Sequence, residues 1–251
     1  MLIPALLVGL VALIGRAEGR FGCQLFLEEP IVLCPLTGFL LGDPITGLLI
    51  GGTLQLVFLG NMGIGAATPA DQVLGSVLAT AIAILSNQGM EIAVALAVPV
   101  AALGQALVIL VRTTFNVYFV KKARNYASEG DPAGVTRMQI LTGIVYCIIT
   151  AFVPAFFAIL AGVPAVQGLL DMLPEVIISG LKAASKMLPG LGFAILFTQM
   201  YQKKYLVFFA LGFVIVAYLG MDTVGLAALA VCVAVIFSLL YNQKPEESEE
   251  V

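Results

Sequence analysis

The sequence predicts an all-α fold, a polytopic transmembrane helix bundle, and three observations support this prediction. Hydrophobic residues make up 61% of the 251 residues and charged residues only 11%, with a mean hydropathy of +1.07. A soluble domain is about 45–50% apolar and about 25% charged. The apolar stretches leave room for about eight to ten segments of membrane-crossing size. They lack the alternating pattern of transmembrane strands, and lipid admits only helices and closed barrels.

The apolar segments follow one another along the chain and are separated by short breaks rich in glycine and proline. A helix needs about 20 residues to cross the hydrocarbon, so several segments are too short to cross alone and are expected to be broken or re-entrant. They cover residues 2–15, 30–41, 44–60, 73–86, 91–111, 139–161, 164–179, 188–200, 205–220 and 222–241. We therefore expect one membrane-embedded domain over residues 1–241 and an acidic solvated tail over residues 242–251.

The charges are distributed unevenly. Residues 112–138 are rich in lysine and arginine, which predicts a cytoplasmic loop. Residues 30–111 contain no lysine or arginine but three acids, Asp43, Asp71 and Glu91. An acid at the bilayer centre costs about 2.5–3.5 kcal/mol, so such a group faces the bundle interior or a water-filled cavity, unless it caps a helix at the interface. This region is expected to hold the functional site.

Glycines dominate the region from residue 38 onward. Gly38, Gly42, Gly47 and Gly51 form small-xxx-small pairs, which predict close packing between helix backbones. The following stretch, residues 60–71, contains three more glycines and a proline, and these weaken a helix. At bilayer depth, non-helical backbone is tolerated only where it is buried in protein or lines a cavity.

A broken helix here would place several polar side chains beside free backbone groups. Gln55, Asn61, Asp71 and Gln72 offer both donors and acceptors, as a polyhydroxyl ligand needs. The alternative is a plain loop between two helices at the membrane surface, and composition alone leaves both open.

The same residues carry a resemblance to a known family. From Gly38 the sequence reads G-x-x-x-G-D-x-x-x-G-x-x-x-G-G-T-L, then an amide, then G-x-M-x-I-G-A-A and a Pro/Asp pair ending at Asp71. The chain resembles, over nearly its whole length, the membrane IIC subunits of the mannose/fructose/sorbose class of the bacterial phosphotransferase system (PTS). Glu29-Pro30 and the segment 173–176, Leu-Pro-Glu-Val, also match.

The resemblance implies a multi-pass permease subunit of the bacterial cytoplasmic membrane that moves a hexose or amino sugar inward. It implies an elevator-type transporter that pairs with a IID membrane subunit, in a higher oligomer of IIC–IID pairs. Soluble IIA and IIB proteins would carry phosphate on histidines and phosphorylate the sugar. The chain contains no histidine, so it cannot carry a phosphohistidine and we expect no catalytic residue in it. We also expect no cofactor, metal or nucleic-acid partner.

Four residues are predicted to contact the sugar. Gln55 stands where the family commonly has Glu, and Asn61 is shifted by two positions from the family Asn. Asp71 keeps the family position, where it could accept sugar hydroxyls or cap the helix that follows. Gln24, in the link between the first two segments, aligns with a family acid.

One different class of function stays open at this stage. An ion-coupled secondary transporter could use Asp71 or Glu91 as a proton or cation site. It would transport its solute without partner proteins, whereas a IIC subunit requires them.

Overall fold

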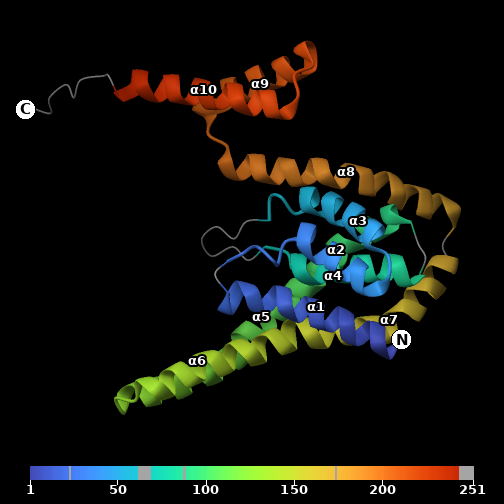
Figure 1. Cartoon of the computed structure of the whole chain (residues 1–251), viewed down its shortest axis with the longest axis vertical. Coiled ribbons are helices and arrows are strands. Elements are labelled where there is room, and N and C mark those ends of the chain that lie inside the picture. The colour runs from blue at the N-terminus through green and yellow to red at the C-terminus, as the bar shows by residue number, and fades with distance from the viewer. Residues whose placement is uncertain (23, 62–68, 87–88, 173, 243–251) are drawn as a thin grey trace, which may run out of the picture. The chain divides into compact units, whose positions relative to one another are not determined.

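The structure is a computed structural model that describes residues 1–22, 24–61, 69–86, 89–172 and 174–242. The described residues are almost entirely helical and include no strand, in agreement with the predicted all-α class (Figure 1). The chain divides into two compact units, Met1–Gln199 and Met200–Val251. The second unit contains α9 (Leu206–Leu219) and α10 (Thr223–Asn242). Within the predicted tail, residues 243–251 lie outside the described residues.

Three helical stretches are long and apolar enough to cross a membrane, among the residues described. They are α1 (Leu2–Phe21), α5 (Met90–Ser128), and the continuous stretch Pro132–Gly162. The last comprises α6 (Pro132–Cys147), a π-helical turn (Ile148–Phe152) and the first half of α7 (Val153–Met172). At 1.5 Å per residue, the 20 residues of α1 give about 30 Å, which matches the hydrocarbon thickness.

Three consecutive helices are too short to cross. They are α2 (Pro30–Leu41), α3 (Pro44–Val57) and α4 (Gln72–Ser86), of 12, 14 and 15 residues. Their lengths of about 18–23 Å agree with the prediction of broken or re-entrant segments. Asp43 caps α3 by accepting a hydrogen bond from the Thr46 amide at 3.0 Å.

Close packing of α2 against α3 depends on the predicted glycines. A Cβ atom at Gly47 would lie 2.6 Å from the Cys34 carbonyl oxygen and 3.0 Å from the Gly38 Cα. Real Cβ atoms do not approach other atoms so closely, so only glycine allows this separation. The hairpin formed by α2 and α3 then packs on α4, and α4 packs on α1, α5 and α7.

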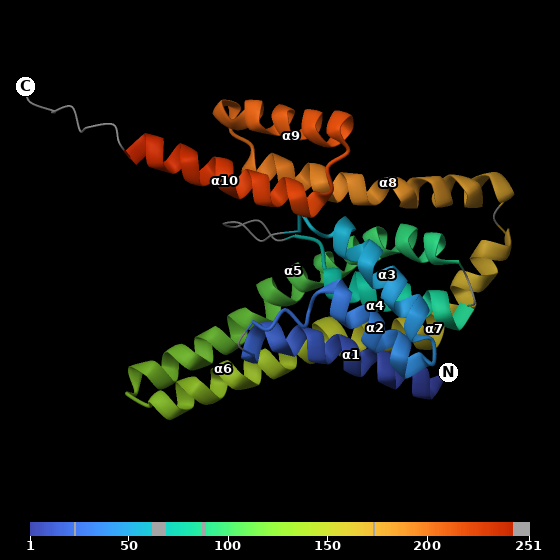
Figure 2. The same ribbon diagram turned by 45° about the horizontal axis from the view of Figure 1, so that its top comes forward.

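The α5–α6 region departs from the prediction. Residues 112–138 were expected to form a loop, but α5 continues to Ser128 and α6 begins at Pro132. Figures 1 and 2 show α5 and α6 running side by side, joined by a short turn. The prediction of a loop was wrong because Lys, Arg and Glu keep a segment out of the hydrocarbon but are themselves good helix formers.

The chain after α7 also differs from the expected segments. Residues 164–179 were predicted as one segment, but α7 ends at Met172 and α8 spans Glu175–Met200. Pro174 lies at this break, and a proline inside a helix would remove a hydrogen bond and clash with the preceding turn. The C-terminal half of α8 contacts the end of α3 and the residues that follow it: a Cβ at Gly192 would lie 2.6 Å from the Val57 carbonyl oxygen, and one at Gly60 would lie 2.7 Å from Ile195.

Candidate functional site: a polar cavity beside the helix break

The predicted helix break is present in the described residues on both of its sides. Helix α3 ends at Val57 and α4 begins only at Gln72, so Phe58 to Asn61 and Pro69 to Asp71 are not helical. Residues 62–68, including the predicted Gly63 and Gly65, lie outside the described residues.

A cavity of about 220 Å³ lies beside this break. Its walls come from the end of α1, the link before α2, both sides of the break, the middle of α5 and the end of α6. Most of its lining residues are polar or charged: Arg16, Arg20, Glu28, Asn61, Asp71, Gln72, Gln105, Arg112 and Tyr146. A small concave site with converging polar groups is typical of a binding site for a small polar ligand.

Asp71 joins three helices at the wall of this cavity. Its carboxylate forms an ion pair with Arg16 of α1 and accepts a hydrogen bond from the Leu74 amide at 3.2 Å, which caps α4. Its own amide donates to the Ala101 carbonyl of α5 at 3.0 Å. The side chain of Asp71 is 0% exposed and that of Arg16 is 12% exposed. Both oxygens of the carboxylate are therefore already used in this structure.

Glu29 is the centre of a second group of hydrogen bonds. It accepts from Gln55 Nε2 at 2.8 Å and from Gln72 Nε2 at 3.4 Å. Asn61 Nδ2 donates to Gln72 Oε1 at 3.2 Å and to the Ala70 carbonyl at 2.8 Å. The four side chains of Glu29, Gln55, Asn61 and Gln72, here called the amide network, connect the start of α2, the end of α3 and the start of α4.

The four predicted site residues therefore occupy different places. Asn61 and Asp71 line the cavity. Gln55 is not a lining residue, and hydrogen bonds through Glu29 link it to the lining residue Gln72. Gln24 is exposed in the link before α2, with a left-handed φ of 55°, and it does not line the cavity. The structure brings three of the four residues into one region and leaves Gln24 apart.

Several polar residues of the site were missed by the sequence analysis. Arg16 and Arg20 are spaced i, i+4, so that one face of α1 becomes cationic at its end. Gln105 is the single polar residue in the apolar run 92–111, and Arg112 lies two turns further along the same face of α5. An isolated amide in an apolar helix was the signal that could have identified Gln105.

Glu28 is the second acid of the cavity. Burial of its side chain raises the pKa of Glu28 above its ordinary value, while the charge of Arg16 acts in the opposite direction, and the neighbouring Glu29 raises it further. The cavity therefore carries three arginines, the fully paired Asp71, and a glutamate whose negative charge is disfavoured by its surroundings.

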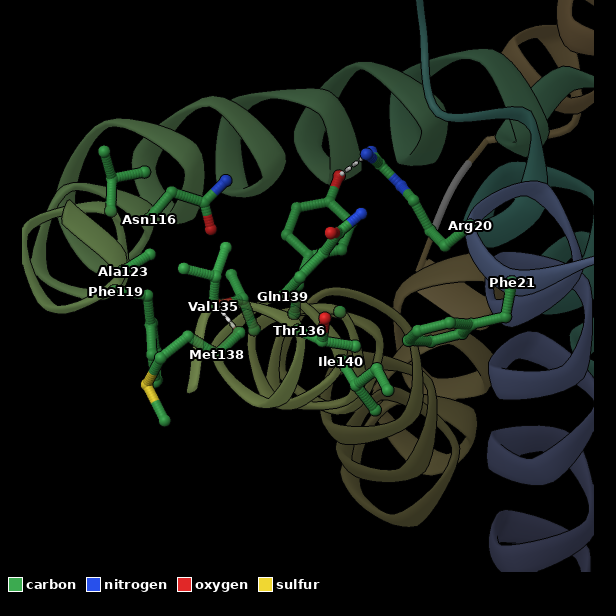
Figure 3. Close-up of a pocket in the computed structure, with 14 residues that line it drawn as sticks. Arg20, Phe21, Asn116, Phe119, Ala123, Val135, Thr136, Met138, Gln139 and Ile140 are labelled. Carbon is green, nitrogen blue, oxygen red and sulfur yellow. Dashed lines mark hydrogen bonds between the residues drawn. The ribbon is translucent and has the colours of Figure 1, made fainter. Parts of the chain in front are cut away.

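A second, larger cavity of about 610 Å³ adjoins the first. Figure 3 shows its lining side chains, which come from α5 and α6 and from Arg20 and Phe21 at the end of α1. Arg20 donates a hydrogen bond to the Tyr146 hydroxyl at 3.1 Å and lies 4.5 Å from the centre of its ring. Because both residues line both cavities, this pair forms part of the wall between them.

Apolar helices long enough to cross a membrane, short paired helices, a helix break and a polar cavity define a class: a multi-pass membrane protein built to pass or bind a small polar solute. A family model described as the PTS system sorbose-specific IIC component matches residues 2–236. The chain belongs to this family of phosphotransferase-system IIC subunits, which are multi-pass permeases of the cell membrane.

Individual relatives agree with this assignment. The fructose permease IIC component of Bacillus subtilis is 35% identical over 243 residues, which cover 97% of this chain and 85% of that protein. A solved structure described only as a membrane protein matches with a TM-score of 0.82 at 33% identity, covering 100% of this chain and 99% of its own. A cryo-EM structure of the mannose transporter ManYZ with microcin E492 matches with a TM-score of 0.61 at 32% identity, with the same coverage.

Proposed function

We propose that this chain moves a hexose or an amino sugar inward across the cytoplasmic membrane, for phosphorylation by a IIB partner. The observation that carries the proposal is the amide network beside the broken helix. Two of its members, Asn61 and Gln72, line the cavity. Its carboxylate can accept from sugar hydroxyls, and its three amides can both donate to and accept from them. Relatives named for fructose, sorbose and mannose support a hexose as the substrate class.

The network is suited to exchange its internal hydrogen bonds for bonds to a ligand. Gln55, Asn61 and Gln72 are half-buried, and each uses its amide on a neighbouring side chain or carbonyl. A bound sugar would replace these bonds with bonds of similar strength, so that binding leaves few polar groups unpaired. We assign Asn61 and Gln55 as sugar contacts, and Gln24 as a contact that requires movement of the link.

Asp71 has a different place in the proposal. Its two oxygens already accept from Arg16 and from the Leu74 amide. Its side chain is also 0% exposed, so it would contact a sugar hydroxyl only after a motion uncovered it. A motion that separates α1 from α4 would release it, and this gives Asp71 a role that changes between transport states.

The proposed transport cycle is of the elevator type. The short helices α2, α3 and α4 would carry the sugar, and the long helices would act as the scaffold. Because this chain has no histidine, phosphate must reach the sugar from soluble IIA and IIB proteins. A IID subunit would complete the membrane complex, in a higher oligomer of IIC–IID pairs. The pairing is supported by the similar solved structure, which is named as the mannose transporter ManYZ.

Sugar uptake in a bacterial strain without its own mannose-class permease tests the proposal. Expression of this chain with a IID subunit and phosphocarriers should restore accumulation of one labelled hexose or amino sugar. The same strain without IID should show none. Uptake that is equal with and without IID would refute the proposed function.

A further inference from the structure

The cavity beside the helix break has more cationic donors than its acids can satisfy. Arg16, Arg20 and Arg112 face two acids, Glu28 and Asp71. Asp71 forms an ion pair with Arg16 and caps α4. Arg20 donates a hydrogen bond to Tyr146. A site for a neutral sugar alone does not need three guanidinium groups.

Three donor groups have no partner among the described residues. Arg16 Nε and Gln105 Nε2 are buried without a hydrogen bond. Arg112 is exposed and makes no hydrogen bond or ion pair with any described residue. A buried donor without a partner costs about 1–3 kcal/mol, so this arrangement is expected to be compensated by an acceptor that binds there.

The location of the cavity along α5 agrees with an anionic ligand. Arg112 is the first basic residue of α5 after an apolar run that begins at Ile92, and Lys121, Lys122 and Arg124 follow it. By the positive-inside rule this end of α5 lies toward the cytoplasm. A phosphorylated sugar would be formed on that side of the membrane.

We propose that Arg16, Gln105 and Arg112 form a subsite for the phosphoryl group of the phosphorylated sugar, next to the amide network that binds its hydroxyls. The inference rests on the proposed function and adds the recognition of its product. Guanidinium and amide donors are the groups that bind phosphate oxygens best in proteins, and Arg does so through two parallel bonds. The subsite would hold the product on the cytoplasmic side until it leaves.

A lipid headgroup offers related chemistry at the same level of the membrane. A phosphate monoester presents three terminal oxygens and close to two negative charges, whereas a lipid phosphodiester presents two oxygens and one charge. The cavity has three separate unpartnered donors in about 220 Å³. It therefore matches the compact monoester better, and we commit to the sugar phosphate.

Isothermal titration of the purified complex of this chain with IID tests the subsite. The probes are mannose 6-phosphate, fructose 1-phosphate and inorganic phosphate, compared with mannose and fructose. For the phosphate ester that binds, R112Q should raise the Kd about tenfold, because a bond to a charged group is lost. The Kd of the parent sugar should change less than about twofold, since Arg112 does not contact the hydroxyls.

Two further variants make the test specific. Q105L should also weaken the phosphate ester, and retained binding of the parent sugar shows that it folds. R124Q removes the same charge from an exposed position of α5 that does not line the cavity, and should leave all affinities unchanged.

Four results would overturn the subsite. The first is an unchanged affinity of R112Q for the phosphate ester, and the second is an equal loss in R124Q, which would indicate unspecific attraction. The third is loss of phosphate-ester binding when the complex is moved from phosphatidylcholine nanodiscs to nanodiscs with phosphatidylglycerol, since a lipid would then occupy Arg112. Binding of the parent sugar without any phosphate ester would refute the subsite and leave the proposed function intact.

Discussion

Replacing Arg16 by glutamine removes the cation that pairs with Asp71, and the structure allows the consequence to be estimated. The Asp71 side chain is 0% exposed, so its charge has no access to solvent once Arg16 is lost. Breaking one partner of a buried ion pair costs about 3–5 kcal/mol. For a chain of about this length, each kcal/mol lowers the Tm by about 2–4 °C, which predicts a fall of roughly 6–20 °C for R16Q.

This fall in Tm can be measured by thermal unfolding of the purified complex, followed by light scattering or by the fluorescence of a thiol-reactive dye. The double variant R16Q/D71N should recover most of the loss, because Asn still caps a helix and leaves no buried charge. R137Q, which removes an exposed arginine of α6, is the matched control. A Tm for R16Q within about 2 °C of the unmodified protein would refute this account of Asp71.

Three further predictions follow from the same structure. G47A should lower the Tm, because its Cβ would clash with the facing helix at a cost of about 1–3 kcal/mol. G52A should raise it, because a Cβ there would meet no neighbouring helix within 4 Å and alanine favours a helix over glycine. E29A should reduce sugar uptake at least about tenfold, because Glu29 accepts the hydrogen bonds that hold the amide network together. E129A, at the exposed end of α5, is the control and should leave uptake unchanged. Equal uptake by the two variants would contradict the proposed site. Burial raises the pKa of Glu28, so the folded state binds more protons than the unfolded state. The free energy of unfolding should therefore fall as the pH rises above about 4.5. E28Q should abolish this contribution, which unfolding measured at several pH values would show.

Much of the fold followed from local sequence features. The starts of α2 and α3 are set by Pro30 and Pro44, each at a first helical position, and the predicted segments 30–41 and 44–60 agree closely with the structure. The glycine spacing predicted the close hairpin between them. Each of these features depends on only a few neighbouring residues, so one sequence was enough to predict the helix starts and the close packing of α2 on α3.

The long helices and the site were harder to predict. Hydropathy reports where a chain leaves the hydrocarbon, so it could not show that α5 continues as a helix beyond Arg112. The pairing of Arg16 with Asp71 joins residues 55 positions apart, and nothing in either neighbourhood specifies the partner. Gln105 had a local signal, but its place in the cavity depends on the packing of α5 against α4.

The central claim is that this chain transports a sugar together with partner proteins that phosphorylate it. Proteoliposomes containing this chain and IID, supplied on the inside with IIA, IIB and the phosphate-donating enzymes, test it most directly. Labelled sugar should appear inside only as its phosphate ester, and an imposed proton or sodium gradient without the phosphocarriers should drive no accumulation. Accumulation of unmodified sugar by this chain alone under an ion gradient would contradict the account.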